Sequence, residues 1–123
     1  MFGIVNLTKK RPPRVAWQEI TEHVLGKRYD MSLVFAGDAR SKALNRLYRK
    51  KNKIANVLSF PISPDMGEVM LNLTEAAREA KLLGTNVRRQ SAYLFIHGLL
   101  HLKGYRHGST MEHTERELVS RFV

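Results

Sequence analysis

One long helical segment constrains the fold most. Residues 86–103 have helical periodicity, and apolar side chains lie on most sides of the central stretch from Ala92 to Leu102. A helix that is apolar all round is buried, because other elements must cover it. Gly84 ends the element before it and Gly104 ends the segment itself, as glycines commonly do after helices. The sequence therefore predicts a central helix surrounded by the rest of the chain.

Shorter patterns predict the elements that cover this helix. Alternating or buried apolar runs indicate strands at residues 2–7, 31–35, 56–60 and 69–73. Helical spacing indicates a helix carrying Trp17, Ile20 and Val24, one after Gly37-Asp38, one over 74–83 and one over 109–121. Strands alternate with helices early and helices dominate late. We therefore predict an α/β (α+β-like) fold in one small domain, residues 1–123, with a mixed sheet of about four strands and about five helices.

Proline and capping residues predict where these elements begin and end. Pro12-Pro13 pre-sets the first turn of the first helix, since proline fits the first helical position. Pro61 ends the third strand, because proline cannot donate to a sheet ladder. Thr85 is the expected N-cap of the long helix. Ser109 to Glu112 has the spacing of a capping box, which predicts the start of the last helix.

The helix expected after Gly37-Asp38 has an apolar side and a basic side. The apolar stripe, expected to face the core, consists of Ala43, Leu44, Leu47 and Tyr48. The basic residues expected to point away from the core at helical spacing are Lys42, Arg46, Arg49 and Lys53. Residues 40–53 hold seven basic residues and no acidic one, in a chain of formal net charge +10. Such a surface favours a polyanionic partner.

Three histidines in the segment HGLLHLKGYRH have the spacing of metal ligands. His97 and His101 lie four residues apart on the long helix, so their Cβ atoms are about 5–6 Å apart on one face. Gly104 breaks the helix and allows the chain to return His107 to the same metal. Three histidines leave one coordination position open, as in catalytic zinc sites. Alternatively, the first two are core histidines and the third a loop residue, although buried imidazoles without partners cost desolvation energy.

Gly98 argues against a protease. The histidine spacing also occurs in metzincin proteases, whose motif has a general-base glutamate directly after the first histidine. Here that position is glycine, so the mechanism lacks the group that takes the proton from water. The chain contains no cysteine, which excludes thiolate ligands, cysteine nucleophiles and disulfide partners. A phosphodiester substrate fits the basic charge better than a peptide does.

Four segments in order resemble one known family. The histidine segment is similar to the H-G-x-L-H-L-x-G-Y-D-H signature of the YbeY family of rRNA-maturation endoribonucleases. Residues 44–49 (LNRLYR), 56–61 (NVLSFP) and 67–69 (GEV) are similar to that family's L-N-x-x-Y-R, N-V-L-S-F-P and G-E-I blocks. The similarity covers the chain from about Met31 to the last helix. One difference stands beside the third histidine, where Arg106 replaces the usual Asp.

The resemblance implies a zinc-dependent endoribonuclease that prefers single-stranded RNA. It would act in the cytoplasm, in maturation of the 3′ end of small-subunit rRNA and in ribosome quality control. The zinc ligands carry over to His97, His101 and His107, and the functionally important arginine to Arg49. Lys42 and Arg46 would guide the RNA strand. We expect no membrane partner, since no stretch approaches the roughly 18 apolar residues of a spanning helix, and the oligomeric state stays open.

The residues leave several alternatives open. One is a non-catalytic, zinc-stabilised module that binds rRNA or the ribosome. Structural zinc has four protein ligands, so a fourth ligand from His113, Glu112 or Asp65 would favour this alternative. Another is a metallohydrolase of a small phosphoester, which the long basic run disfavours. For the endoribonuclease, the nucleophile is either zinc-activated water or the RNA 2′-hydroxyl. Imidazoles also bind nickel, copper and iron, so the preference for zinc depends on the resemblance.

Three aromatic side chains near these segments are candidates for base stacking. Single-stranded nucleic acids are commonly held by bases stacked on aromatic rings. We expect Tyr48, Phe60 and Tyr105 to belong to the core instead, because they fall in buried patterns or beside a packing glycine. The basic charge gives a firmer expectation, which is that RNA binding weakens steeply with added salt.

Overall fold

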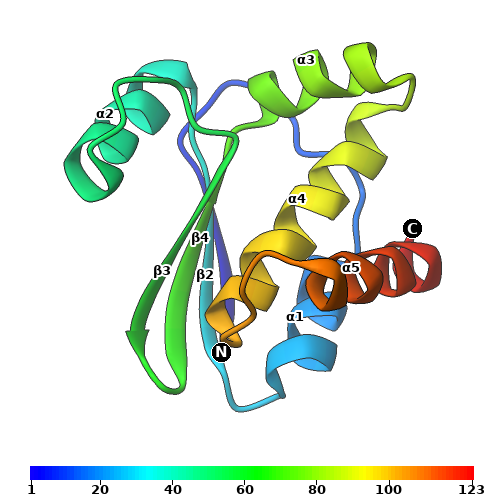
Figure 1. The fold of residues 1–123 in the computed structure, drawn as a ribbon. Coiled ribbons are helices and arrows are strands. Elements are labelled where there is room, and N and C mark those ends of the chain that lie inside the picture. Colours follow the sequence, from blue (N-terminus) through cyan, green and yellow to red (C-terminus); the bar gives the residue numbers. More distant parts are fainter.

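A computed structural model describes all 123 residues and shows a four-stranded sheet with helices on both faces (Figure 1). The strands are β1 (Phe2–Asn6), β2 (Asp30–Phe35), β3 (Val57–Ser63) and β4 (Met66–Leu71), in the spatial order β1-β2-β4-β3. β1, β2 and β4 run parallel, and β3 is antiparallel to β4. The predicted mixed sheet is therefore confirmed, with β1 and β3 at its edges.

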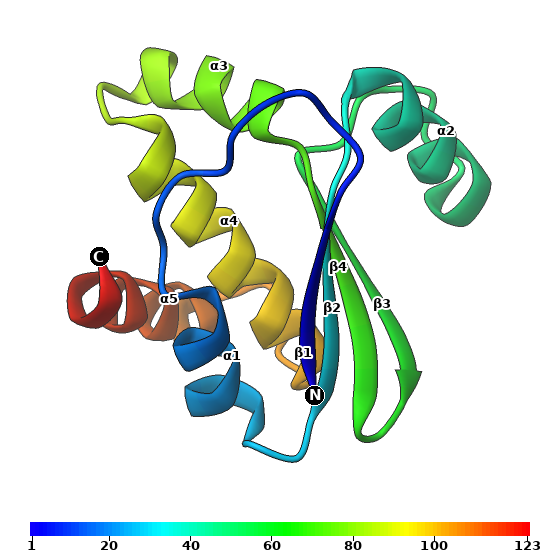
Figure 2. The same ribbon diagram turned by 180° about the vertical axis from the view of Figure 1, so that it is seen from behind.

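The five helices are α1 (Trp17–Leu25), α2 (Asp38–Arg49), α3 (Leu73–Leu83), α4 (Val87–Leu102) and α5 (Ser109–Phe122). Figures 1 and 2 show α1, α4 and α5 on one side of the sheet and α2 on the other, with α3 across one end. The α/β class and the number of helices agree with the sequence prediction. No helix combines the length and apolar character that a membrane span requires.

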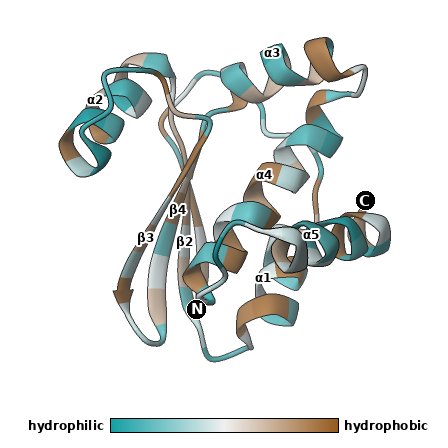
Figure 3. Cartoon of the chain, in the orientation of Figure 1, coloured by the Kyte–Doolittle hydropathy of each residue, from teal (hydrophilic) through white to brown (hydrophobic).

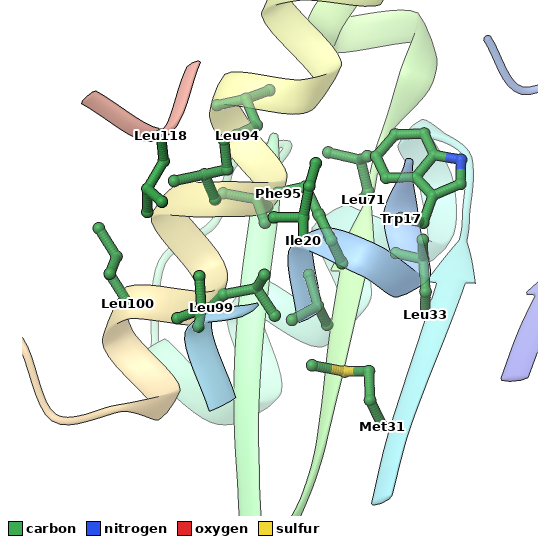
Figure 4. Close-up of a cluster of buried hydrophobic side chains, with 14 of the residues drawn as sticks. Trp17, Ile20, Met31, Leu33, Leu71, Leu94, Phe95, Leu99, Leu100 and Leu118 are labelled. Carbon is green, nitrogen blue, oxygen red and sulfur yellow. The ribbon is translucent and has the colours of Figure 1, made fainter. Parts of the chain in front are cut away.

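The main core lies between the sheet and α4 (Figure 4). Alternate residues of β2, namely Met31, Leu33 and Phe35, point into it and are almost fully buried. On α4, nine residues are buried, which confirms the predicted central helix. Trp17 of α1 packs edge-on against Phe95 of α4, with ring centroids 5.1 Å apart. Burial of each large apolar side chain contributes about 1.5–3 kcal/mol, so this face of the sheet fixes the position of α4.

The other face of the sheet carries a much smaller core beneath α2. It consists of Ala36, Ala55, Leu58 and Met70, with Leu44 and Phe60 packed against it. Figure 3 shows hydrophilic colours over much of α2. The helix is thus attached by few apolar contacts, and polar ones supplement them.

The predicted orientation of α2 is wrong for three of the four apolar residues, since only Leu44 packs against the core. Leu47 and Tyr48, expected to face the core, are 70% and 62% exposed, whereas Ser41 and Asn45 are buried. Both buried residues form hydrogen bonds: the Ser41 hydroxyl accepts from the backbone N–H of Ala55, and the Asn45 amide donates to a backbone carbonyl in the following loop. These bonds satisfy the Ser41 hydroxyl and the Asn45 amide N–H, whereas Oδ1 of Asn45 is buried without a partner. Polar contacts thus hold the sheet-facing side, and Leu47 and Tyr48 face outward. Ala43 is exposed too.

Several predicted boundaries also shift. α1 begins at Trp17, four residues after Pro13, and the prolines lie in the connection between β1 and α1. β3 continues through Pro61 to Ser63, because an edge strand needs hydrogen bonds on only one side. Residues 69–71 are strand as predicted, but residue 73 already begins α3, because Asn72 caps that helix.

The predicted N-caps are also wrong. The N-cap of α4 is Asn86 instead of Thr85, because the Asn86 side chain accepts from the Arg89 N–H. The N-cap of α5 is Gly108, with no side-chain bond, so the expected capping box does not form.

At the end of α2, Lys50 adopts a left-handed conformation with φ 56°. This leaves Lys53 outside the helix that was expected to carry it.

Candidate metal centre

His97, His101 and His107 converge at the end of α4. Their potential ligand nitrogens all lie within 4.8 Å of one another. The two Nε2 atoms of His97 and His101 are 3.1 Å apart. Two nitrogens that bind one tetrahedral zinc at about 2.0–2.1 Å lie about 3.3 Å from each other. The donor set and its spacing therefore fit a single metal ion of this kind.

The turn after α4 returns the third imidazole to the other two. Gly104 has a φ of 103°, a left-handed conformation that favours glycine. Its N–H donates to the His101 carbonyl at 3.0 Å, and the next N–H, of Tyr105, donates to the Leu100 carbonyl at 2.9 Å. These bonds close the helix and reverse the chain within a few residues. The ring centroid of His107 lies 4.6 Å from that of His101 and 5.1 Å from that of His97.

A buried carboxylate behind the cluster is the residue that sequence reasoning missed. Glu115 of α5 is 4% exposed, and its Oε2 lies 2.5 Å from His97 Nδ1. On the second histidine, the Nδ1 of His101 is 3.2 Å from the carbonyl of Tyr105. Acceptors at Nδ1 place the proton there and leave the Nε2 lone pair for a metal. The sequence held one signal for its burial, which is that Glu115 lies at helical spacing from Met111 and Leu118, and both of these are buried.

Burial shapes the charge of the cluster. It lowers the pKa of the His101 imidazole, and the neighbouring imidazole of His97 lowers it further. A lowered pKa keeps His101 neutral at physiological pH, which is the form that binds a metal.

Gly98 brings α4 close to the sheet. A Cβ atom at this position would lie 3.0 Å from the Ser59 Oγ and 3.2 Å from a methyl group of Val69. The Ser59 hydroxyl donates to the Gly98 carbonyl at 2.8 Å. The position after the first histidine therefore faces β3 and β4, and a larger side chain there would have to displace the sheet. This geometry agrees with the sequence argument against a metzincin-like glutamate.

The histidines line a groove of about 370 Å³ that crosses the edge of β3. Arg49, at the end of α2, lines the same groove, as do Tyr48 and Phe60. Lys42 and Arg46 are exposed on α2 and do not line it. Of the predicted site residues, the structure thus brings together the three histidines and Arg49.

Among the three aromatic side chains, only the placement of Tyr48 differs from the prediction. Tyr48 was expected in the core but is 62% exposed. Phe60 and Tyr105 are partly buried and pack against the small and the main core, as expected. Arg106, which replaces the family's aspartate, is also exposed.

The residues considered as a fourth ligand lie elsewhere. The cluster of possible metal-binding side chains contains the three histidines and no carboxylate. His113 lies on the exposed side of α5, where its Nε2 is 3.0 Å from a carboxylate oxygen of Glu117. Asp65 accepts a hydrogen bond from Ser63 in the β3–β4 turn. The arrangement thus retains the three-histidine set expected of an open site.

Comparison with known proteins identifies relatives over nearly the whole chain. A relative named Endoribonuclease YbeY from Aquifex aeolicus is 34% identical over 111 residues, covering 83% of this chain and 74% of the relative. One of the same name from Persephonella marina is 34% identical over 124 residues, covering 94% and 78%. A solution structure of a Thermotoga maritima protein shares the fold, with a TM-score of 0.68 at 21% identity over 98% of this chain and 87% of that one. The family described as Endoribonuclease YbeY matches residues 6–122, and the chain belongs to this family.

Proposed function

We propose that residues 1–123 form one zinc-dependent endoribonuclease domain that cuts single-stranded RNA during rRNA maturation. The observation that carries this proposal is the convergence of three imidazoles in a groove that also contains Arg49. Endoribonuclease is the activity named for the relatives, which supports RNA as the substrate. Maturation of the small-subunit rRNA 3′ end and ribosome quality control in the cytoplasm are the roles we propose for it.

The metal-binding role falls to His97, His101 and His107. When bound, zinc supplies a Lewis acid with an open coordination position for cleavage of a phosphodiester. The protein's part is to present neutral imidazoles in fixed orientations. Glu115 holds the His97 ring through Nδ1, and the carbonyl of Tyr105 does the same for His101.

Arg49 is the residue we propose to bind the scissile phosphate. It lines the groove with the histidines, and a guanidinium can bind two phosphate oxygens through parallel N–H···O bonds. Lys42 and Arg46 lie earlier on the exposed side of the same helix, so they can attract and guide the flanking strand. The cluster contains no carboxylate to act as a general base, so solvent water would accept the proton of the nucleophile.

The test is cleavage of a single-stranded rRNA fragment by metal-stripped protein, with and without added zinc. We expect zinc to restore cutting in the wild type and not in His101→Ala. His113→Ala is the matched control, because this histidine is 65% exposed and pairs only with Glu117. RNA binding without zinc-dependent cutting would refute the nuclease and favour a non-catalytic rRNA-binding module. Products with 5′-phosphate ends would indicate water as the nucleophile, and 2′,3′-cyclic phosphate ends would indicate the 2′-hydroxyl.

A further inference from the structure

Tyr48 is an exposed aromatic ring with no role in the core. It is 62% exposed, although it lies on a helix that packs against the sheet. The buried side of that helix is held by hydrogen bonds of Ser41 and Asn45, so contacts other than this ring attach the helix. A large exposed aromatic side chain that lies among functional groups indicates a binding surface.

Phe60 fixes the orientation of this ring. The two ring centroids are 5.1 Å apart, with an angle of 67° between the planes. In such an edge-to-face pair, the edge of one ring meets one face of the other. Aromatic surface therefore stays free on the pair while its orientation is held. Phe60 is itself anchored in the small core beneath α2.

The pair lies in the same groove as the candidate metal centre. Tyr48 and Phe60 line one part of it, the histidines line another, and Arg49 follows Tyr48 directly in the chain. A strand bound in this groove can therefore contact both the Arg49 guanidinium and the free aromatic surface. The surrounding segment, residues 40–53, carries seven basic residues and no acidic one, which is complementary to a polyanion.

We infer that Tyr48, held by Phe60, stacks on an unpaired nucleobase next to the scissile phosphate. This inference deepens the proposed function and depends on it. Stacking uses the face of a base, which is available in a single strand and covered by neighbouring bases in a duplex. The pair would therefore favour single-stranded RNA while accepting any base, since every base has a face of this kind.

Binding measurements on metal-stripped protein test the inference without relying on cleavage. Two short single-stranded RNAs of equal length are compared at one fixed salt concentration, one with all its bases and one with abasic residues. We expect Tyr48→Ala to weaken binding of the normal strand by about 5- to 150-fold, the range for loss of one stacked base. Binding of the abasic strand should stay unchanged. Tyr48→Phe retains the ring and should bind the normal strand like the wild type.

Leu47→Ala is the matched control. Leu47 precedes Tyr48 on α2, is 70% exposed and does not line the groove, so its removal should leave both affinities unchanged. Equal binding of the normal strand by wild type and Tyr48→Ala would refute the inference and leave the proposed nuclease intact. Equal weakening of both strands would also refute it, because the ring would then support Arg49 or the helix. Failure of the wild type to bind either strand would refute the proposed function as well.

Discussion

Replacement of Glu115 tests how the protein presents its metal-binding histidines. The carboxylate is 4% exposed and lies 2.5 Å from His97 Nδ1, so the contact is shielded from water. A hydrogen bond to a charged acceptor contributes about 1.5–3 kcal/mol, and one to a neutral acceptor about 0.5–1.5 kcal/mol. Glu115→Gln keeps the shape and removes the charge. We therefore expect it to lose about 1–1.5 kcal/mol of zinc-binding free energy, which raises Kd about 5- to 13-fold.

Glu115→Ala removes the acceptor entirely and should have a larger effect. Loss of such an outer contact typically lowers metal affinity 10- to 100-fold. The assay is competition for zinc against a chromogenic chelator at pH 7.5, where the lowered pKa of His101 keeps that ligand neutral. Unfolding of the metal-free variants, recorded in parallel, separates a change in ligand orientation from a change in fold.

Glu117→Gln is the control for this series. Glu117 lies on the same helix but is 66% exposed and contacts only His113, so zinc affinity should not change. If Glu115→Ala and Glu115→Gln both bind zinc like the wild type while remaining folded, the carboxylate does not tune His97. The assignment of its role would then be refuted.

Three further predictions concern the groove and the attachment of α2. Gly98→Ala should lower the free energy of unfolding by about 1 kcal/mol in a denaturant titration. Overpacking of the new methyl group against Ser59 costs more stability than alanine adds to the helix. A more stable variant would contradict this. Arg49→Lys should lower kcat/KM for RNA about tenfold, because lysine cannot form the second of two charge-assisted hydrogen bonds to the phosphate. An unchanged kcat/KM would exclude a bidentate phosphate contact. Asp38→Asn should destabilise the protein at pH 7, because the bond from Arg78 holds the pKa of the Asp38 carboxyl below its usual value. That stabilisation is present above about pH 4, the unfolded value, and is lost as pH falls through the lower folded pKa, so the stabilities of wild type and variant should converge as the pH falls below that value in denaturant titrations.

The periodic elements could be predicted because each carries its own pattern. The alternation of Met31, Leu33 and Phe35 reports burial of one strand face, and the apolar surface of α4 reports burial on most sides. The order of the strands could not be predicted. The order depends on which strand edges pair with each other. Short apolar runs with similar alternation do not determine which strand lies beside which.

The orientation of α2 shows where periodicity misleads. Its apolar residues form a stripe, but Ser41 and Asn45 face the sheet because they find hydrogen-bond partners in the loop after the helix. Such long-range polar contacts have no periodic signal. The error also hid the position of Tyr48, whose exposure the sequence did not predict.

The three histidines could be predicted because their spacing is local. Two lie one helical turn apart, and the third follows a single glycine-dependent turn. Glu115 comes from another helix, and its contact with His97 depends on how α5 packs on α4. A lone glutamate in an otherwise apolar helix face was the only local indication, and it does not name a partner.

The open edge of β3 has a consequence for self-association. Unpaired N–H and C=O groups at a sheet edge can pair with a strand from another molecule. In β3, Pro61 lacks an N–H, and the pairing register shifts between Pro61 and Ser63. A second copy therefore cannot extend the sheet along the whole of this edge. Pro61 thereby confines any such pairing to the residues of β3 that precede it, and these are the residues that line the histidine groove.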